Sequence, residues 1–126
     1  MLEIGLIATS KTKVDKNNTA IALGSGDLEV FATPAMIALM ENAAMNAIAP
    51  ELEEGTTSVG TSISASHIKA SGVGAQVVAT ATVTAVDGRL IKFYVAAHDG
   101  ETLIGEGEHT RFIVDKARFM QKVTSL

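Results

Sequence analysis

The stretch FATPAMIALMENAAMNAIAP, residues 31–50, decides the fold expected for this chain. Thr33 followed by Pro34 has the form of a helix start, with a hydroxyl N-cap and a proline in the first turn. Residues 35–49 are almost all strong helix formers, and Pro50 ends the run. A helix that is apolar almost all round is buried, and at about 15 residues this one is shorter than the roughly 20 that span a bilayer. We therefore predict a central helix wrapped by the rest of the chain.

After residue 56 the hydrophobic pattern changes from helical to alternating, which is typical of half-buried strands. Four such strands are expected, over residues 57–69, 73–85, 90–97 and 102–114. Asp87-Gly88 and Asp99-Gly100 are hairpin signals, so the four strands are predicted to form an antiparallel meander. Before the helix, residues 2–15 indicate a first strand and residues 19–23 a short one, and residues 115–123 indicate a terminal helix or a frayed tail.

This order of elements predicts an α+β chain with the hot-dog fold, in which a curved antiparallel sheet wraps one long central helix. Inward-facing alanines on the strand over residues 73–85 leave room for the helix to lie close to the sheet. On the strand over residues 57–69, strict alternation places His67 on the apolar face with Val59 and Ile63. The same alternation places Gly60 on the opposite face, with the serines.

Length and composition limit the classes of protein that the chain can belong to. Its 126 residues indicate one domain, residues 1–126, and 47% hydrophobic residues with two prolines exclude a disordered chain. The absence of cysteine excludes disulfides, thiolate nucleophiles and cysteine zinc sites, and it fits a cytoplasmic protein. The N-terminus does not resemble a signal peptide, and we expect no membrane association. A net charge of −4 with scattered Lys and Arg argues against nucleic-acid binding.

Glu41 is the anomalous residue of the predicted helix. It lies between Leu39, Met40, Ala43 and Ala44, where a carboxylate must be paired or have a shifted pKa. One interpretation is a buried acid or base. The alternative is a thin polar stripe that Glu41 shares with the asparagines at positions 42 and 46.

Thr33, His67 and Glu41 together allow a catalytic relay. Eight helical residues separate Thr33 from Glu41 by roughly 12 Å and about 80° of rotation, so they cannot touch. An imidazole can bridge them, either within one protomer or across a dimer interface. Glu41 would then orient His67, which would act as the general base. The alternatives are a satisfied core histidine for His67 and a simple N-cap for Thr33.

Three spaced motifs carry a family resemblance: FATP-AMIALME, EGTTSVGTSISASH and VAAHDGETLIGEGEHTR. Together they resemble the fluoroacetyl-CoA thioesterase-like family of hot-dog proteins from residue 31 to about residue 114. The resemblance implies hydrolysis of an acyl-CoA thioester, with coenzyme A as part of the substrate and no other cofactor. It also implies a homodimer, or a higher oligomer, with acyl-CoA sites at the subunit interface.

The resemblance assigns roles to five positions. Thr33 matches the family's active-site hydroxyl, Glu41 its helix carboxylate and His67 its strand histidine. Gly60 matches the glycine that lines the substrate site, and Arg111 matches the arginine near the thioester. The alternatives are a packing glycine for Gly60 and a solvated strand residue for Arg111.

The segment before the helix departs from the family. The fluoroacetyl-specific member has an aromatic, proline-bearing lid, whereas residues 22–30 here are ALGSGDLEV, shorter and without an aromatic. The acyl specificity is therefore left open. Of the other histidines, His98 is expected to face solvent and His109, two residues from Arg111, is a candidate neighbour of the site. No spacing typical of zinc is present, so no metal is expected.

Two other functions compete with hydrolysis. A hot-dog hydratase or dehydratase also uses a histidine with a carboxylate on an acyl thioester. A non-catalytic acyl-CoA-binding module is the third interpretation, although a binder has no need of a buried base.

Overall fold

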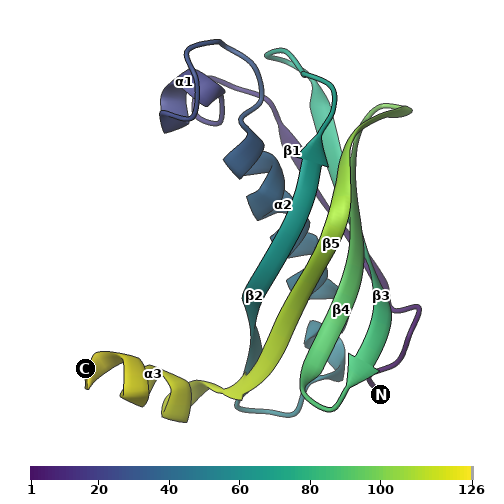
Figure 1. The fold of residues 1–126 in the computed structure, drawn as a ribbon, viewed down its shortest axis with the longest axis vertical. Helices are drawn as coiled ribbons and strands as arrows, with labels where there is room; N and C mark the ends of the chain where they lie inside the picture. The colour runs from purple at the N-terminus through teal and green to yellow at the C-terminus, as the bar shows by residue number, and fades with distance from the viewer. Residues whose placement is uncertain (126) are drawn as a thin grey trace.

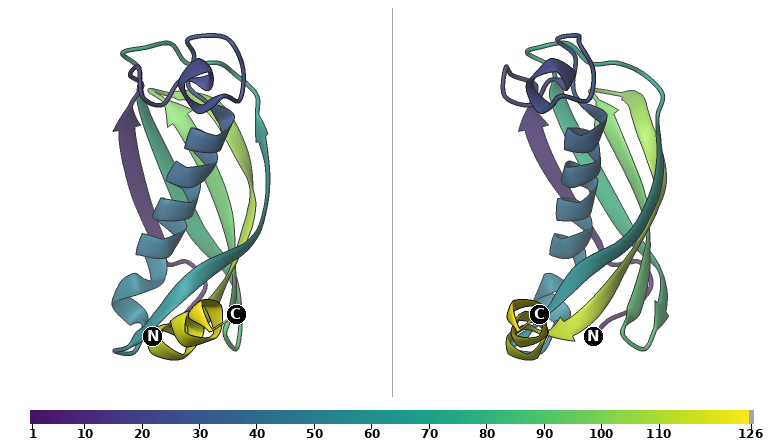
Figure 2. Two further views of the ribbon diagram at one scale, coloured as in Figure 1. Left: turned by 90° about the vertical axis from the view of Figure 1, so that its left-hand side faces the viewer. Right: turned by 60° about the vertical axis from the view of Figure 1, so that its left-hand side comes forward.

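A 16-residue helix, α2 (Thr33–Ile48), lies in the hollow of a curved five-stranded antiparallel sheet (Figures 1 and 2). This computed structural model describes residues 1–125. The strands are β1 (Ile7–Lys13), β2 (Thr56–His67), β3 (Gln76–Asp87), β4 (Leu90–Asp99) and β5 (Thr102–Asp115). The remaining elements are the short helix α1 (Ala20–Leu23), the 3-10 turn η1 (Ala49–Glu51) and the terminal helix α3 (Lys116–Thr124). The α+β hot-dog architecture predicted from the sequence is confirmed.

The sheet has the strand order β1-β3-β4-β5-β2. Strands β3, β4 and β5 form the expected meander, but its predicted first member is wrong, because β2 pairs with β5 and not with β3. Alternation identifies a strand without naming its partner, and residues 68–75, which link β2 to β3, cross from one side of the sheet to the other. Strand β2 is therefore an edge strand, with one side paired and the other free.

The core lies between α2 and the sheet. The helix contributes six buried side chains to it: Met36, Met40, Ala43, Ala44, Ala47 and Ile48. On β3 the inward positions are Val77, Ala79, Ala81 and Val83, all of them buried. Two of these four are alanines, so the backbones of helix and sheet come close, as the sequence predicted.

One face of α2 remains uncovered. Ala38, Asn42, Met45 and Asn46 are exposed, so the prediction of a helix buried almost all round is wrong for a single chain. The sheet curls around one side of the helix, and the other side carries an alanine, two asparagines and Met45. An apolar helix that its own chain covers on one side is available to a second surface.

Of the two short segments outside the sheet, the first differs from expectation and the second takes the helical form of the two alternatives expected for it. Residues 19–23 form α1 instead of a strand, because the Thr19 side chain accepts a hydrogen bond from the Ala22 N–H and Gly24, with φ of 72°, ends the turn. After β5, Asp115 caps α3 by accepting from the Arg118 N–H, so the terminal segment is helical. Within residues 1–125 no helix is long and apolar enough to cross a membrane.

Candidate active site

Thr33 and His67 meet at the beginning of α2. Thr33 is the first residue of the helix and His67 is the last residue of β2, and the Thr33 Oγ1 and His67 Nδ1 atoms are 2.8 Å apart. The N-cap position belongs to Ala32, so the Thr33 hydroxyl does not cap the helix. The interpretation of Thr33 as a simple N-cap is therefore wrong. When Nδ1 carries no proton, the Thr33 hydroxyl donates to it, which is the arrangement that a general base requires.

The surroundings of His67 favour the neutral imidazole. The ring is half-buried and packs edge-on against Phe31, with ring centroids 6.4 Å apart. Burial lowers the pKa of His67, and a backbone contact with Lys69 opposes this shift without reversing it. Its Nε2 atom is buried and finds no hydrogen-bond partner within residues 1–125. A buried polar atom without a partner is uncommon, so the hydrogen-bonding capacity of this ring nitrogen is unsatisfied within residues 1–125.

A cavity of about 240 Å³ opens beside this pair. Thr33, His67 and Phe31 form one side of it. The segment around α1 contributes Ala20, Ser25 and Val30, and the link after β2 contributes residues 68–70. Pockets for drug-sized ligands have volumes of roughly 300–1,000 Å³, so this smaller cavity suits a small group.

A second cluster lies further along α2, on the inner face of β2 and β5. Arg111, 6% exposed, donates from Nε to Ser58 Oγ (2.8 Å) and from Nη2 to the Ser58 carbonyl oxygen (2.9 Å). Its Nη1 atom lies 3.2 Å from His109 Nε2. His109 is 1% exposed, and its Nδ1 atom lies 2.7 Å from the Ser62 carbonyl oxygen. His109 therefore donates from Nδ1 and accepts at Nε2, so its imidazole is neutral.

Burial dominates the electrostatics of this cluster. It lowers the pKa of His109, and the adjacent Arg111 charge lowers it further. Burial also lowers the pKa of Arg111, while the Glu41 carboxylate acts in the opposite sense on both groups. His109 stacks on Phe93 with ring centroids 5.9 Å apart, which fixes the plane of the imidazole.

Glu41 reaches this second cluster across Gly60. A Cβ atom added to Gly60 would lie 2.8 Å from Glu41 Oε2, 3.2 Å from His109 Cε1 and 3.4 Å from Arg111 Nη1. The missing side chain of Gly60 therefore leaves the space into which these three groups converge. Within residues 1–125 no salt bridge joins Glu41 to Arg111 or His109, and Glu41 is half-buried. The carboxylate is close to a positive charge but is not neutralised by direct contact.

The five predicted site residues thus form two groups. Thr33 and His67 are hydrogen-bonded to each other, whereas Glu41, Gly60 and Arg111 lie together with His109. No hydrogen bond joins Glu41 to His67 within residues 1–125, so one chain by itself does not complete a hydrogen-bonded relay. The form of the relay that spans a dimer interface stays a prediction.

The sequence placed Gly60 on the wrong face of its strand. Gly60 pairs with Arg111 and Ser62 pairs with Thr110, so the register shifts by one residue between them. This β-bulge reverses the alternation, and Gly60 and His67 both face inward. Alternation alone contains no signal for a bulge, and for the same reason it missed Ser58, which holds the Arg111 guanidinium. Of the other histidines, His109 joins the second cluster, and His98 on β4 lies outside both.

Comparison with known proteins identifies the family. The family model described as fluoroacetyl-CoA-specific thioesterase matches residues 14–117. The fluoroacetyl-CoA thioesterase of Streptantibioticus cattleyicolor is 44% identical over 95 residues, which cover 75% of this chain and 68% of that protein. A crystal structure of the fluoroacetyl-CoA thioesterase FlK superposes with a TM-score of 0.92 at 36% identity, covering 99% of this chain and 97% of that one.

A more distant structure has the same fold. A Thermus thermophilus protein of the thioesterase superfamily superposes with a TM-score of 0.91 at 28% identity, over 99% of this chain and 93% of its own. The family match covers most of the chain, and the FlK superposition extends over almost all of it. This chain is therefore a thioester hydrolase that belongs to the fluoroacetyl-CoA-specific thioesterase family of the hot-dog superfamily.

Proposed function

We propose that this enzyme hydrolyses coenzyme A thioesters of small acyl groups, with Thr33, His67 and Glu41 as its catalytic residues. The observation that carries the proposal is the 2.8 Å contact between Thr33 Oγ1 and His67 Nδ1 at the wall of a 240 Å³ cavity. A hydroxyl held against a neutral imidazole is a nucleophile beside its base. The family's established chemistry, thioester hydrolysis, needs such a pair.

In the proposed reaction, His67 removes the proton from the attacking oxygen, which is the Thr33 hydroxyl or a water molecule bound by it. The attacking oxygen bonds to the thioester carbonyl carbon, and the carbonyl π electron pair moves to the carbonyl oxygen. When this pair returns, the carbon–sulfur bond breaks, and the coenzyme A thiolate takes a proton from the imidazolium. If Thr33 attacks, a second cycle with water releases the acid from the acyl-enzyme. Overall, one water molecule and one thioester give one acid and one thiol.

Glu41 and Arg111 supply the electrostatic part of the proposal. The Glu41 carboxylate stabilises the imidazolium or activates the attacking water, and Arg111 provides positive charge beside the developing oxyanion. The missing Cβ of Gly60 lets the Glu41 carboxylate lie close to the His109 and Arg111 side chains, which the proposal takes as the polar wall of the site. Because Glu41 does not contact His67 within one chain, the proposal includes a homodimer in which two chains complete each site. The free edge of β2 supports it, since joining two edge strands in an isologous pair removes both exposed edges.

The acyl group is proposed to be short. The relatives are named for fluoroacetyl-CoA, and one FlK mutant structure contains acetyl-CoA. Residues 22–30 contain no aromatic side chain, so we do not expect this enzyme to discriminate strongly for fluorine.

Release of free coenzyme A thiol tests the proposal. Acetyl-, fluoroacetyl-, butyryl- and octanoyl-CoA would be supplied to wild-type protein and to His67→Ala. We expect thiol release that is fastest for the two-carbon substrates and is lost in the variant. Binding without thiol release would indicate an acyl-CoA-binding module, and addition of water across a crotonyl-CoA double bond would indicate a hydratase. Either result would contradict hydrolysis as the function.

A further inference from the structure

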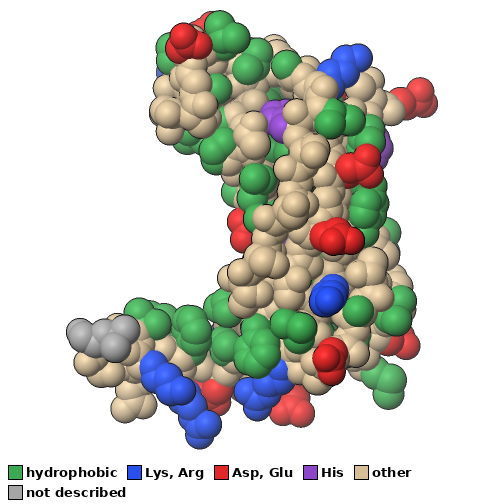
Figure 3. All heavy atoms as spheres, viewed as in Figure 1, with side chains coloured by type: hydrophobic (Ala, Val, Ile, Leu, Met, Phe, Trp, Pro, Cys, Tyr) green, Lys and Arg blue, Asp and Glu red, His purple; other side chains and the backbone are tan. Residues whose placement is uncertain are grey.

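The molecule has a deep hollow along one side, bounded by an arm at each end (Figure 3). One arm is the segment around α1, residues 20–30, called here the 20–30 lobe. The other is α3, which projects away from the sheet at the opposite end of the molecule (Figures 1 and 2). Between the two arms lies the free edge of β2. Within residues 1–125, each arm has a side that the rest of the chain leaves exposed.

Both arms expose apolar side chains. On α3 these are Phe119, Met120 (52% exposed) and Val123. On the 20–30 lobe they are Ile21, Leu23 and Leu28 (65% exposed). Apolar side chains gathered on a projecting helix are typical of a protein–protein contact.

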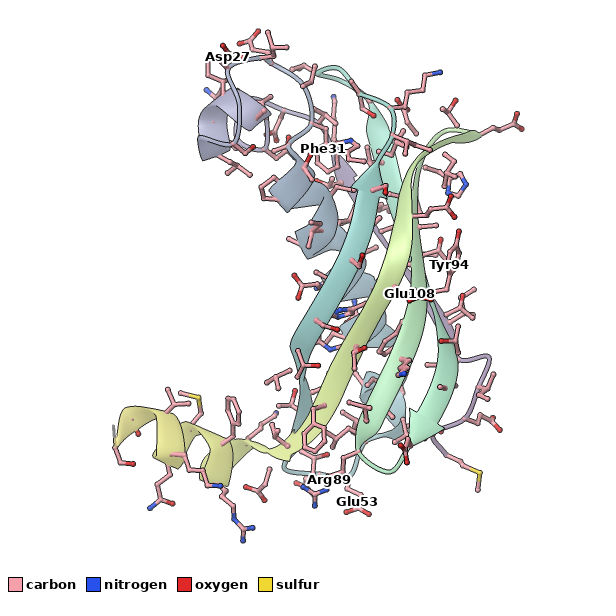
Figure 4. The ribbon with its side chains drawn as sticks, in the orientation of Figure 1. Asp27, Phe31, Glu53, Arg89, Tyr94 and Glu108 are labelled. Atoms are coloured by element: carbon pink, nitrogen blue, oxygen red, sulfur yellow. The ribbon has the colours of Figure 1, made fainter. Side chains whose placement is uncertain are left out.

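The two arms also carry opposite charge. The 20–30 lobe contains Asp27 and Glu29 and neither Lys nor Arg. Helix α3 contains Lys116, Arg118 and Lys122 and neither Asp nor Glu. Asp27 lies at the outer tip of the lobe, at the far end of the molecule from α3 (Figure 4). Complementary charges on separate surfaces favour one partner orientation over others.

We propose that α3 of each protomer packs on the 20–30 lobe of the partner, over the cavity beside Thr33 and His67. The proposal rests on the homodimer of the proposed function. Strand β2 begins at Thr56, which pairs with Asp115, the N-cap residue of α3, and it ends at His67. When two β2 edges join antiparallel about a two-fold axis, the α3 end of one chain comes next to the His67 end of the other. The same two-fold axis places the acidic lobe of each chain against the basic helix α3 of the other, so the contact occurs twice in the dimer.

This contact gives α3 a role at the active site. The lobe contributes Ala20, Ser25 and Val30 to the wall of the cavity, so a helix packed on the lobe closes the outer side of that wall. Residues 22–30 lack an aromatic of their own, and Phe119 of the partner subunit would supply one. Helix α3 of one chain is therefore a positioning element that sets the size of the acyl cavity of the other chain. None of its residues takes part in the chemistry.

Disulfide trapping tests the contact directly, because the chain contains no cysteine. Leu28→Cys would be combined with Val123→Cys, or with Met120→Cys one helical turn earlier. The 20–30 lobe and α3 lie at opposite ends of the folded molecule, so a disulfide between them must join two chains (Figure 1). We expect covalent dimers under mild oxidation. The control pairs Leu28→Cys with Ile7→Cys on β1, the edge strand on the other side of the sheet, and should stay monomeric on a non-reducing gel. Cross-linking of the control alone, or of no pair, would overturn the proposal.

Charge reversal provides an independent measurement. Arg118→Glu with Lys122→Glu, and separately Asp27→Lys with Glu29→Lys, should each raise the dimer dissociation constant by about tenfold at low salt. The chain that carries all four changes should return toward the wild-type constant, because the attraction is restored with its signs exchanged. If the chain with all four changes instead shows the two losses of binding free energy added together, the proposed contact is overturned. Thiol release by the wild type is assayed in parallel: an active dimer without coupling contradicts this inference alone, whereas the absence of hydrolysis contradicts the proposed function.

Discussion

The two clusters along α2 differ in how completely their polar atoms are satisfied. In the Arg111–His109 cluster, backbone and side-chain partners hold the guanidinium and both imidazole nitrogens. In the Thr33–His67 pair, by contrast, the imidazole has one partner and leaves Nε2 without one within residues 1–125. A fully bonded network is rigid, whereas an incomplete one at a cavity wall can exchange partners with a substrate. The first cluster is therefore suited to holding a charge in place and the second to moving a proton.

In the proposed mechanism Glu41 would connect the two clusters, although within residues 1–125 it contacts neither by a salt bridge. Its neighbour Arg111 is buried, and a buried charge without a direct counter-ion is costly. Stability alone would favour closing this gap with a direct ion pair. Without a Cβ at Gly60, the carboxylate and the guanidinium approach each other at this point of β2 without forming an ion pair.

The largest expected effect distinguishes the reactive pair from the fixed cluster. His67→Ala should lower kcat by about 10²–10⁴-fold while leaving the melting temperature almost unchanged, because the imidazole is half-buried and has one side-chain hydrogen bond. His98→Ala, on β4 outside both clusters, is the matched control and should retain wild-type kcat. Single-turnover hydrolysis beside thermal melting measures both quantities. Lost stability with unchanged turnover per folded molecule would make His67 a core residue.

Glu41→Gln is expected to have the next largest effect. The amide keeps the shape of the side chain and removes its charge, so turnover should fall by about 10²-fold or more, while stability should fall slightly because buried Arg111 loses the attraction of the carboxylate. Binding of coenzyme A, measured by calorimetry, should survive. Glu101→Gln in the exposed β4–β5 turn serves as the charge-matched control. Turnover near wild type in Glu41→Gln would place Glu41 on a merely polar stripe of the helix.

Gly60→Ala tests the space between the clusters. The new Cβ would lie 2.8 Å from Glu41 Oε2, which must move, and the end of a flexible side chain can do so at small cost. We expect kcat/KM to fall by about tenfold, which corresponds to about 1.4 kcal/mol, with little loss of stability. Gly72→Ala is the control, because a Cβ there meets no atom within 4 Å and its φ is not positive. Equal effects of the two substitutions would show that the space over Gly60 is not used.

Much of this arrangement was predictable from sequence, and the exceptions have identifiable causes. The helix over residues 33–48 and the strands that follow it emerge from helix propensity and alternation, which are local properties of the chain. The pairing of β2 with β5 depends on where the link over residues 68–75 crosses the sheet, and no local pattern encodes that. Likewise, one inserted residue at the bulge after Gly60 was enough to reverse its predicted face. Family resemblance alone pointed to Gly60 and Arg111, whose roles stay predictions, while Ser58, which anchors the guanidinium, carried no signal.

The smallest expected effect concerns pH, and it compares the two histidines directly. Burial lowers the pKa of both His67 and His109 in the folded chain, below the value of about 6.5 of an unfolded histidine. Between the folded and unfolded pKa values, the unfolded chain binds more protons, so stability falls as the pH drops below about 6.5 and is fully present above it. The melting temperature should therefore decrease on acidification from pH 7.5 to pH 5.5. His109 is more deeply buried, with both ring nitrogens bonded, so His109→Gln should flatten this dependence more than His67→Gln.

Activity should show the opposite ranking, because only His67 must be neutral to accept a proton. The acid limb of kcat should lie below pH 6.5 and should persist in His109→Gln. An acid limb that disappears in His109→Gln would assign the base to the second cluster and contradict the contrast between the two.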